Sequence, residues 1–431
     1  MKIQAYQSEE GHYFVETELQ PVQGMKADFA LDTLPVKQTI LGFGGAITDA
    51  AIGVYLGLEQ TQQKKVFDLI YSPEGLNYNY ARLTIGSCDF SRTIYDYAQK
   101  DDLSDFSLAH DAPIIALVKQ AQKKGDFHVL ASCWSPLARY KDNGDKSHGG
   151  HLKPECYAAH ADYIARYVKE MGKLGVQVEA LTIQNEPEAT QTWESCRFSA
   201  EEEARLALLL HERLPHVDLY AWDHNRDVLV RRITATFSDP AARSAYAGIA
   251  YHWYDPGCSQ EIAKVHALFP EKKILFSEGC VELLNLNPKD PASAIGSYNG
   301  LLRYADNYIQ DLNAGSQGFI DWNILLDDLG GPNHMGNYCE APIMAGHNRF
   351  AINPSYHAIK HFSHFVKEGA SFLSLPEVSQ IEGAAFRNPG GSLVLVILNK
   401  GKEKPISFSI ENVVYSVYLK GNSLVTFLVT L

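Results

Sequence analysis

The sequence predicts an α/β protein, namely a (β/α)8 barrel (TIM barrel) with an appended antiparallel β-sandwich built from both termini. Between residues 39 and 327, eight apolar strand-like segments alternate with segments of helical spacing, a pattern typical of this barrel. After residue 366 the pattern changes to short strands separated by turn signals such as NPGG and KGN. We therefore assign residues 39–365 to the barrel, and residues 1–38 together with 366–431 to the sandwich.

The elements follow from hydrophobic spacing and from helix-end signals. Barrel strands are expected at 39–48, 78–86, 127–134, 177–186, 217–225, 248–254, 272–280 and 318–327. Helical spacing marks 59–72, 111–124, 156–175, 199–214, 293–315 and 355–369. Ser199 is expected to cap the start of its helix and Gly175 to close another. The sandwich strands are expected at 2–8, 12–19, 380–388, 392–400, 405–412, 414–420 and 422–430.

Composition excludes several classes of protein. The 431 residues carry a formal net charge of −13, which argues against binding to nucleic acid or another polyanion. No apolar run approaches the roughly 20 residues of a membrane span, and the first residues lack the apolar core of a signal peptide. The seven cysteines are odd in number and form no CxxC pair, which indicates free thiols in a reducing compartment. We expect a cytoplasmic protein, and the sequence predicts no oligomeric state.

Two carboxylates stand at the ends of predicted strands. Asn185 and Glu186 end the fourth strand, and Glu278 ends the seventh. The carboxyl ends of barrel strands face one active-site mouth, so the fold can bring the two glutamates together. A single glutamate in such a place is more often solvated or salt-bridged, but two of them in an eightfold repeat favour a shared pocket. Pro187 supports this reading modestly, because it biases Glu186 away from helix.

Two carboxyl groups that face each other across a pocket are what glycoside hydrolysis requires. One protonates the departing oxygen, and the other attacks the sugar or activates water. A separation of about 5–5.5 Å gives retention of configuration and about 6.5–9.5 Å gives inversion. The acid should have a raised pKa while its partner is charged.

Other strand ends carry residues that suit a sugar. Asp89 could accept hydrogen bonds from hydroxyl groups or cap a loop. Arg82 lies inside an apolar run and is expected to need a carboxylate partner. Aromatic rings, which could stack on a sugar or simply fill the core, end three further strands: Trp134, then Trp253 and Tyr254 after His252, then Trp322 beside Asn323.

Six motifs agree in order and spacing: GFGGAITDAA, LTIGSCDFS, TIQNEPE, AYHWYD, FSEGCVE and DWNILLDDLGGPNHMGN. Together they resemble glycoside hydrolase family 30, and most of all its glucosylceramidase (acid β-glucosidase) branch. The likeness runs from about residue 41 to the end of the chain. It implies a retaining O-glycosyl hydrolase, exo-acting on β-glucosides, in carbohydrate or sphingolipid metabolism. Its side β-sandwich would be built from both termini, and we expect neither a cofactor nor a metal.

The resemblance also implies roles for single residues. Glu186 would be the acid/base and Glu278 the nucleophile, with Tyr254 orienting Glu278. Asn185 would hydrogen-bond the sugar 2-hydroxyl. The residues expected to line the sugar subsite are Asp89, Trp134, Trp322 and Asn337, with Arg82 and His252 as supports behind it.

The sequence departs from the lysosomal members of that branch. It has neither their signal peptide nor their disulfide-rich N-terminal segment. Trp193, in the loop EATQTWESCRF, is expected to replace an aromatic residue that meets the aglycone. His334 stands where the lysosomal members have an aromatic residue. Aglycone preference and the rim of the pocket are therefore the least determined features.

Alternatives remain open. The expected ligand is a β-glycoside, whether a small molecule, an oligosaccharide or a glycolipid. A β-xylosidase, a β-fucosidase or an endo-β-1,6-glucanase could use the same catalytic residues, because variable loops decide the glycone. A non-catalytic carbohydrate-binding barrel is disfavoured, because both glutamates are present. A metal-dependent hydrolase using His148, His151 and His160 is disfavoured, because these residues lie away from the strand ends.

Overall fold

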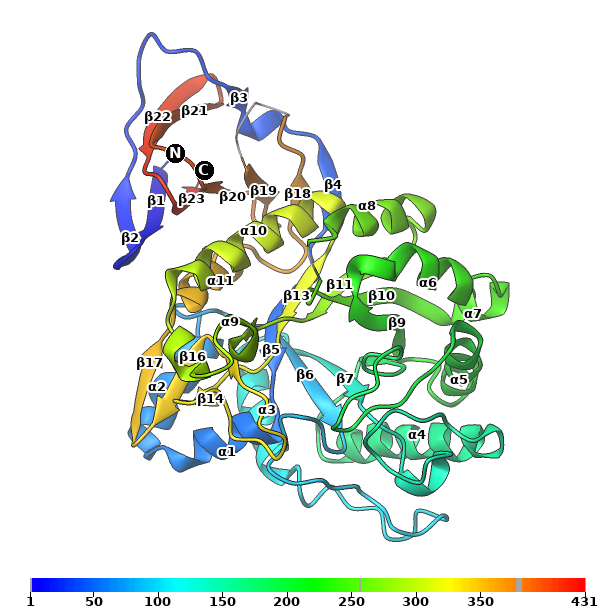
Figure 1. The fold of residues 1–431 in the computed structure, drawn as a ribbon. Helices are drawn as coiled ribbons and strands as arrows, with labels where there is room; N and C mark the ends of the chain where they lie inside the picture. Colours follow the sequence, from blue (N-terminus) through cyan, green and yellow to red (C-terminus); the bar gives the residue numbers. More distant parts are fainter. Residues whose placement is uncertain (1, 256, 377–381, 431) are drawn as a thin grey trace.

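The computed structural model describes residues 2–255, 257–376 and 382–430, and it confirms the predicted barrel and sandwich (Figure 1). The eight barrel strands are parallel and close in the order β10-β11-β13-β5-β6-β7-β8-β9. They are β5 Gly42–Ala46, β6 Tyr80–Ile85, β7 His128–Cys133, β8 Ala180–Thr182, β9 Asp218–Asn225, β10 Tyr246–His252, β11 Lys273–Glu278 and β13 Gly318–Asp321.

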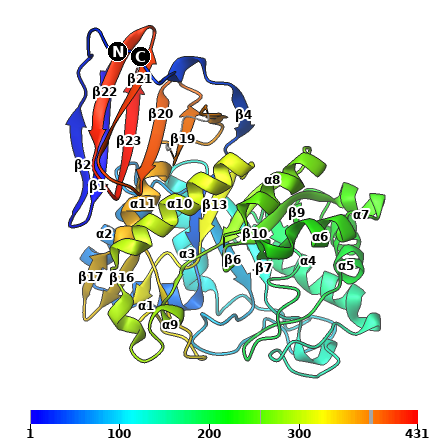
Figure 2. The same ribbon diagram turned by 45° about the horizontal axis from the view of Figure 1, so that its top comes forward.

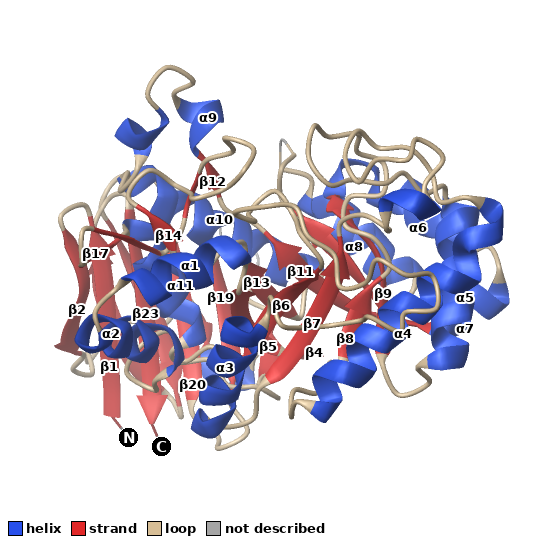
Figure 3. Ribbon diagram, turned by 90° about the horizontal axis from the view of Figure 1, so that it is seen from below, coloured by secondary structure: helices blue, strands red, loops and turns tan. Residues whose placement is uncertain are grey.

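Helices cover the outside of the barrel, as Figure 3 shows. They are α1 Asp49–Gly57, α2 Gln60–Tyr71, α3 Ala112–Ala121, α4 Tyr157–Lys173, α5 Ala200–Arg213, α6 Leu229–Thr236, α7 Pro240–Ala245, α8 Ser259–Leu268, α10 Tyr298–Ala314 and α11 Pro354–Ser363. The predicted cap at Ser199 is confirmed as a capping box, in which the hydroxyl accepts from the Glu202 amide and the Glu202 carboxylate accepts in return. Gly175 adopts a φ of +84° just beyond the end of α4.

Most barrel strands are shorter than expected, above all β8 Ala180–Thr182 within the expected 177–186, and two of the predicted strands are divided. The segment 39–48 is divided between β4 Val36–Thr39, which joins the sandwich, and β5 of the barrel. Gly42 begins β5 with a φ of +145°, and a Cβ there would meet the Asn79 side chain at 2.2 Å. The segment 318–327 is divided as well: β13 ends at Asp321, and Asn323 adopts a φ of +64° before β14 Leu326–Asp327 begins.

Small sheets extend the loops that follow β11 and β13. β14 Leu326–Asp327 pairs with β16 Ile343–Gly346, which pairs in turn with β17 Arg349–Ile352. β12 Val281–Glu282 pairs with β15 Cys339–Glu340, so the loops after the seventh and eighth barrel strands are joined. The short helix α9 Leu283–Leu286 follows β12 and projects from the barrel beside α10 (Figure 3).

The sandwich is built from both ends of the chain. Its larger sheet has the order β2-β1-β23-β20-β19-β18-β4, and its smaller sheet has the order β22-β21-β3. The strands are β1 Lys2–Glu9, β2 His12–Glu18, β3 Phe29–Ala30, β18 Ser371–Leu373, β19 Glu382–Arg387, β20 Leu393–Asn399, β21 Lys404–Ile410, β22 Val413–Leu419 and β23 Ser423–Thr430. Pairing is antiparallel apart from the short parallel contact of β21 with β3. Residues 380 and 381 of one predicted strand lie outside the described residues.

The sandwich packs against α10 and α11 of the barrel (Figure 2). At this junction the buried His361 of α11 lies 2.8 Å from Ser8 Oγ of β1 and 2.8 Å from Thr426 Oγ1 of β23. Asn313 of α10 donates to the Gly383 carbonyl at 2.9 Å. These buried polar bridges fix the sandwich on the side of the barrel, away from the strand ends described below. Within the described residues, every helix is too short or too polar to cross a membrane.

Candidate active site

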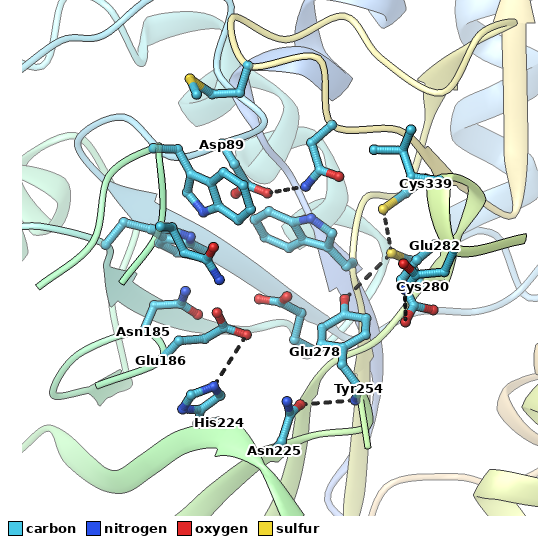
Figure 4. A pocket seen from close by; sticks show the side chains of 18 of the residues that line it. Asp89, Asn185, Glu186, His224, Asn225, Tyr254, Glu278, Cys280, Glu282 and Cys339 are labelled. Atoms are coloured by element: carbon cyan, nitrogen blue, oxygen red, sulfur yellow. Dashed lines mark hydrogen bonds and ion pairs between the residues drawn. The ribbon is translucent and has the colours of Figure 1, made fainter. Parts of the chain in front are cut away.

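A pocket of about 460 Å³ opens at the carboxyl ends of the barrel strands (Figure 4). Nine of the predicted residues line it: Asp89, Trp134, Asn185, Glu186, Trp193, Tyr254, Glu278, Trp322 and Asn337. The two remaining ones, Arg82 and His252, are fully buried and contact pocket residues from behind. The predicted residues therefore come from the ends of six barrel strands, or from the loops after them, and meet at one mouth as this fold requires.

The two glutamates face each other across this pocket. One carboxylate oxygen of Glu186 and one of Glu278 lie, together with a ring nitrogen of His252, within 4.8 Å of one another. Glu278 is the last residue of β11, and Glu186 lies four residues beyond the end of β8. These nearest oxygens lie closer together than the roughly 6.5–9.5 Å that separates the carboxyl groups of inverting glycosidases and leaves room there for a water.

The backbone at Glu186 is held in an uncommon conformation. Its φ is +47°, in the left-handed region that non-glycine residues rarely adopt. The Glu186 amide donates to the Asp223 carbonyl at 3.0 Å, and the Glu186 carbonyl accepts from the Ala189 amide at 2.9 Å. Such conformations persist where neighbouring structure imposes them, and they cluster at active sites. Glu186 is therefore outside the right-handed helical conformation, as Pro187 was expected to favour, and its side chain lines the pocket.

Arg82 is the centre of the charge network behind the two glutamates. Its five N–H donors all have partners: Ser132 Oγ at 3.0 Å, the Ser277 carbonyl at 3.2 Å, Glu278 Oε2 at 2.5 Å, Asn185 Oδ1 at 2.9 Å and Asp223 Oδ2 at 2.7 Å. A buried guanidinium without such partners would be costly. The carboxylate partner expected for Arg82 is thus present twice, as Glu278 and Asp223.

Asp223 is a site residue that sequence reasoning missed. A β-bulge in β9 brings it into the network: Ala250 pairs with Trp222 and Tyr251 with His224, so Asp223 is skipped. Trp222 and Asp223 both have positive φ, +79° and +57°. The signal was available, because the fifth predicted strand ends in DHN and strand ends were already read as functional.

Both oxygens of Asp223 are fully used. Oδ1 accepts from Ser277 Oγ at 2.6 Å and lies 3.0 Å from His252 Nε2. Oδ2 accepts from Thr182 Oγ1 at 2.6 Å and from Arg82. Burial alone would raise the pKa of Asp223, but Arg82 and His252 hold it far below its usual value. Asp223 is therefore a fixed negative charge beneath the pocket.

His252 connects Asp223 to both glutamates. Its Nδ1 atom lies 3.3 Å from Glu186 Oε1 and 3.8 Å from Glu278 Oε1. Burial alone lowers the pKa of His252, but the carboxylates of Glu278, Asp223 and Glu186 outweigh it and raise the pKa to about 9. With both ring nitrogens protonated, His252 can donate to Asp223 and to Glu186 at once.

The two glutamates differ in charge preference. Burial opposes ionisation of Glu186, but the imidazoles of His224 and His252 outweigh it and lower its pKa to about 2. Burial raises the pKa of Glu278, against the opposing effect of His252 and Arg82, and the charge of Glu186 adds to the rise. The expectation of a raised pKa at Glu186 is therefore wrong for the unliganded pocket. The cause is that the two imidazoles lie nearer to Glu186.

The aromatic wall of the pocket is a stacked pair. The rings of Trp134 and Trp322 have centroids 5.2 Å apart and an interplanar angle of 23°. The Arg82 guanidinium lies 4.9 Å from the Trp134 ring centroid, which fixes that ring from behind. Trp253, the third candidate, donates its indole N–H to the Cys280 carbonyl and packs in the core instead.

Polar groups from distant loops meet beside this wall. Asn337 Nδ2 donates to Asp89 Oδ2 at 3.0 Å, which joins the loops after β6 and β13. Burial and the nearby charge of Glu278 raise the pKa of Asp89 well above its usual value, against the donor from Asn337. Asn185 presents its side chain to the pocket while its Oδ1 accepts from Arg82.

The rim contains the positions that were hardest to predict. Trp193 is half-buried and lines the pocket. His334 instead bridges two loops, with Nδ1 2.8 Å from the Ser91 carbonyl and Nε2 3.3 Å from Glu194 Oε2. Tyr254 lines the pocket, and its hydroxyl was expected to contact Glu278. The hydroxyl instead lies 3.5 Å from Cys280 Sγ.

The histidines considered as metal ligands lie apart from one another. His148 pairs with Asp145 at 2.9 Å and His151 with Glu202 at 3.4 Å, both at the surface, while His160 is fully buried in α4. Within the described residues, the one convergent ligand set is Glu186, His252 and Glu278. The raised pKa of His252 favours a proton on its Nδ1 atom, and Arg82 already donates to Glu278 Oε2. Both effects disfavour a bound cation at these three residues.

Two carboxyl groups with oxygens within 4.8 Å of each other, in an aromatic-walled pocket at the mouth of a (β/α)8 barrel, are the arrangement of a glycoside hydrolase. Comparison with known families agrees. Residues 40–366 match the glycosyl hydrolase family 30 TIM-barrel domain, and residues 371–427 match the glycosyl hydrolase family 30 beta sandwich domain. The chain belongs to glycoside hydrolase family 30.

Individual relatives extend this result. The lysosomal acid glucosylceramidase of Mus musculus is 31% identical over 400 residues, covering 86% of this chain and 77% of its own length. The endo-1,6-beta-D-glucanase neg1 of Aspergillus fumigatus is 26% identical over 84% of this chain and 79% of its own length. The crystal structure of SrfJ from Salmonella typhimurium superposes with a TM-score of 0.93, at 33% identity and with both chains covered fully.

Proposed function

We propose that this protein is a retaining, exo-acting β-glucosidase similar in activity to glucosylceramidases, with Glu278 as nucleophile and Glu186 as acid/base. The observation that carries the proposal is the separation of the two carboxylates, whose oxygens approach within 4.8 Å. That proximity leaves little room for a water between Glu278 and the anomeric carbon, which favours direct attack.

Glu278 attacks the anomeric carbon while Glu186 protonates the departing oxygen. A covalent glycosyl–enzyme forms, and the ionised Glu186 then takes a proton from the water that hydrolyses it. Arg82 donates to Glu278 Oε2 and so holds the other oxygen, Oε1, in a defined direction. Oε1 is also the oxygen that lies nearer to His252, on the side of Glu186.

The proton for the first step resides on His252 in the free enzyme. In the unliganded pocket Glu186 is ionised and His252 is cationic, with Nδ1 3.3 Å from Glu186 Oε1. A bound sugar displaces water from the carboxylates. This desolvation favours a neutral Glu186–His252 pair over two opposite charges. The proton then moves from Nδ1 to Glu186, and Asp223 keeps the ring oriented through Nε2.

The shape of the pocket supports an exo mode on a single terminal sugar. Asp89 and Asn337 close one side with their mutual hydrogen bond, and the stacked Trp134 and Trp322 form the wall. Leaving-group atoms would pass Trp193 at the half-buried rim. A glucose glycone is favoured by the relation to glucosylceramidases, and a glycolipid aglycone by the apolar rim residues Trp193 and Leu284.

An endo-β-1,6-glucanase is the second candidate, because a relative named for that activity matches over most of the chain. Such an enzyme would bind further glucose units beyond the rim. The loops that carry Trp193 and Leu284 decide whether the rim has room for them.

One panel of substrates tests both candidates. Rates are measured on nitrophenyl β-glucoside, β-xyloside and β-fucoside, on a glucosylceramide and on a β-1,6-glucan. We expect the highest kcat/KM on the β-glucoside and release of glucose from glucosylceramide. Oligosaccharide products from the glucan would instead establish the endo mode, and a faster β-xyloside or β-fucoside would reassign the glycone. A first product with inverted anomeric configuration, followed by NMR, would refute the mechanism, and inactivity on every substrate would favour a binding protein.

A further inference from the structure

Two cysteines meet in the pocket wall. Cys280, two residues after Glu278, and Cys339, two residues after Asn337, bring their Sγ atoms to 2.7 Å (Figure 4). Both side chains are buried and both line the pocket. The antiparallel pairing of β12 with β15 positions them, with Glu282 opposite Cys339 and Val281 opposite Glu340.

We propose that Cys280 and Cys339 form a redox-active pair that closes to a disulfide and thereby lowers the activity of the pocket. The distance of 2.7 Å exceeds the ~2.05 Å of a disulfide bond but is short for two sulfur atoms that are not bonded. A small shift of two loop segments is therefore enough for the bond to form. By contrast, the sulfur atoms of Cys133 and Cys196 contact backbone carbonyls.

Hydrogen peroxide is an oxidant small enough to enter this pocket. The thiolate of one cysteine attacks a peroxide oxygen, which gives a sulfenic acid and releases hydroxide. The sulfur of the second cysteine then displaces the sulfenic hydroxyl group as water, and the S–S bond forms. In total, two thiols and one peroxide give one disulfide and two waters. Burial raises the pKa of Cys280. The hydrogen bond with Cys280, together with burial, raises the pKa of Cys339. Because the thiolate is the reactive form, the reaction is faster at alkaline pH.

The bond would act on two parts of the proposed sugar site. It joins the segment that carries Glu278 to the segment that carries Asn337, and it draws them together. It also removes the thiol proton of Cys280, whose sulfur lies 3.5 Å from the Tyr254 hydroxyl. A tighter pocket and a Tyr254 hydroxyl with a changed partner both predict a lower kcat/KM in the oxidised protein.

The test uses the full chain with Cys156→Ser and Cys258→Ser, because these two thiols are partly exposed and would be oxidised independently. The protein is treated with hydrogen peroxide at mildly alkaline pH and then with dithiothreitol. We expect the mass to fall by two hydrogen atoms, a cross-linked peptide joining Cys280 to Cys339, and a higher Tm. We also expect a loss of kcat/KM, which dithiothreitol reverses.

Cys280→Ala and Cys339→Ala in the same background are the matched variants, and neither should lose two hydrogen atoms or gain Tm under peroxide, because the remaining thiol has no partner with which to form a disulfide. An unchanged mass in the parent, or a cross-link without a change in kcat/KM, would overturn the proposal. Mass, peptide map and Tm need no substrate, whereas the activity arm alone rests on the proposed function. A wrong choice of substrate is therefore distinguishable from the absence of the disulfide.

Discussion

Arg82 donates to Glu278 at 2.5 Å although the two residues are 196 positions apart in the chain. The contact exists because β6 and β11 lie in one closed barrel and both side chains point to its centre. Arg82 also holds Asp223 and Asn185, so one guanidinium sets the positions of residues from three strand ends. Its planar fork of donors suits this task in a way that a lysine ammonium does not.

Arg82→Lys should retain the charge and lose the geometry. A lysine offers three donors to a cavity in which five donors are satisfied, so Asp223 and Glu278 compete for one ammonium. We expect kcat to fall by about a hundredfold or more, as a result of misplaced reacting groups. Steady-state kinetics on an aryl glucoside measure the loss, and CD spectra establish the fold.

Arg226→Lys is the control for that experiment. Arg226 is similarly buried and holds Asp255 at 3.0 Å and Asp311 at 2.7 Å, but neither of these partners lines the pocket, unlike the Glu278 and Asn185 partners of Arg82. It should lose stability in a comparable way, of about 3 kcal/mol or more, as for other damaged buried ion pairs. Its folded fraction should keep its kcat. Equal losses of kcat in the two variants would show that Arg82 is only a structural residue.

The two glutamates should respond differently to removal. Glu278→Gln should abolish turnover, because an amide cannot attack the anomeric carbon. Glu186→Ala should spare substrates with good leaving groups, which need little protonation, and azide should accelerate it by forming a glycosyl azide of retained configuration. Product analysis by NMR measures this rescue.

Glu188→Ala is the matched control for the Glu186 variant. Glu188 lies two residues further along the same loop and pairs with Arg231 and Arg232 outside the pocket. It should hydrolyse poor and good leaving groups in the ratio of the parent and should not respond to azide. An azide response in Glu188→Ala, or its absence in Glu186→Ala, would contradict the assigned acid/base.

The sequence predicts the barrel site well where the reasoning needs only strand order. Glu186 and Glu278 were found because parallel barrel strands present their polar ends at one mouth, whatever the separation in sequence. Asp223 was missed because a bulge turns it inward, and a bulge depends on pairing with the neighbouring strand. The meeting of Cys280 with Cys339 depends on the paths of two loops, which hydrophobic spacing does not encode.

The edges of the elements illustrate the same limit. The apolar run 39–48 is continuous in sequence, yet the chain leaves one sheet at Thr39 and enters another at Gly42. Local pattern reports that residues are buried in strands, and it does not report which sheet buries them. The lowered pKa of Glu186 has a similar origin, because it arises from His224, at the strand end that was overlooked, together with His252.

His252→Gln should change the pH dependence of catalysis. In the proposed mechanism the alkaline limb of kcat/KM reports loss of the proton shared by His252 and Glu186, so in the parent it should fall near the raised pKa of His252, about 9. Without the imidazolium, the proton is held by Glu186 alone and is lost at lower pH. We expect the alkaline limb to move toward acid by about one unit or more. An unmoved limb would show that His252 only positions its neighbours.

The same residue should make stability depend on pH with a defined sign. The folded pKa of His252, about 9, lies above its ordinary value of 6.5. Its contribution to the free energy of unfolding is therefore complete below pH 6.5 and is lost as pH rises through 9, with a size on the order of 3 kcal/mol. Denaturation at a series of pH values should show the parent losing its advantage over His252→Gln across that interval. A constant difference would contradict the raised pKa.

Trp193→Ala should separate recognition of the leaving group from recognition of the sugar. Trp193 is half-buried at the rim, whereas Trp134 and Trp322 are almost fully buried in the wall that the sugar would contact. Loss of the rim ring should raise KM for a glucosylceramide several-fold and leave KM for a small nitrophenyl glucoside nearly unchanged, since an aromatic contact contributes about 1 kcal/mol or more. Trp322→Phe is the comparison, because it alters the sugar wall and should weaken both substrates alike. If Trp193→Ala weakened both substrates equally, Trp193 would belong to the sugar subsite, and the leaving group would leave the pocket by another path.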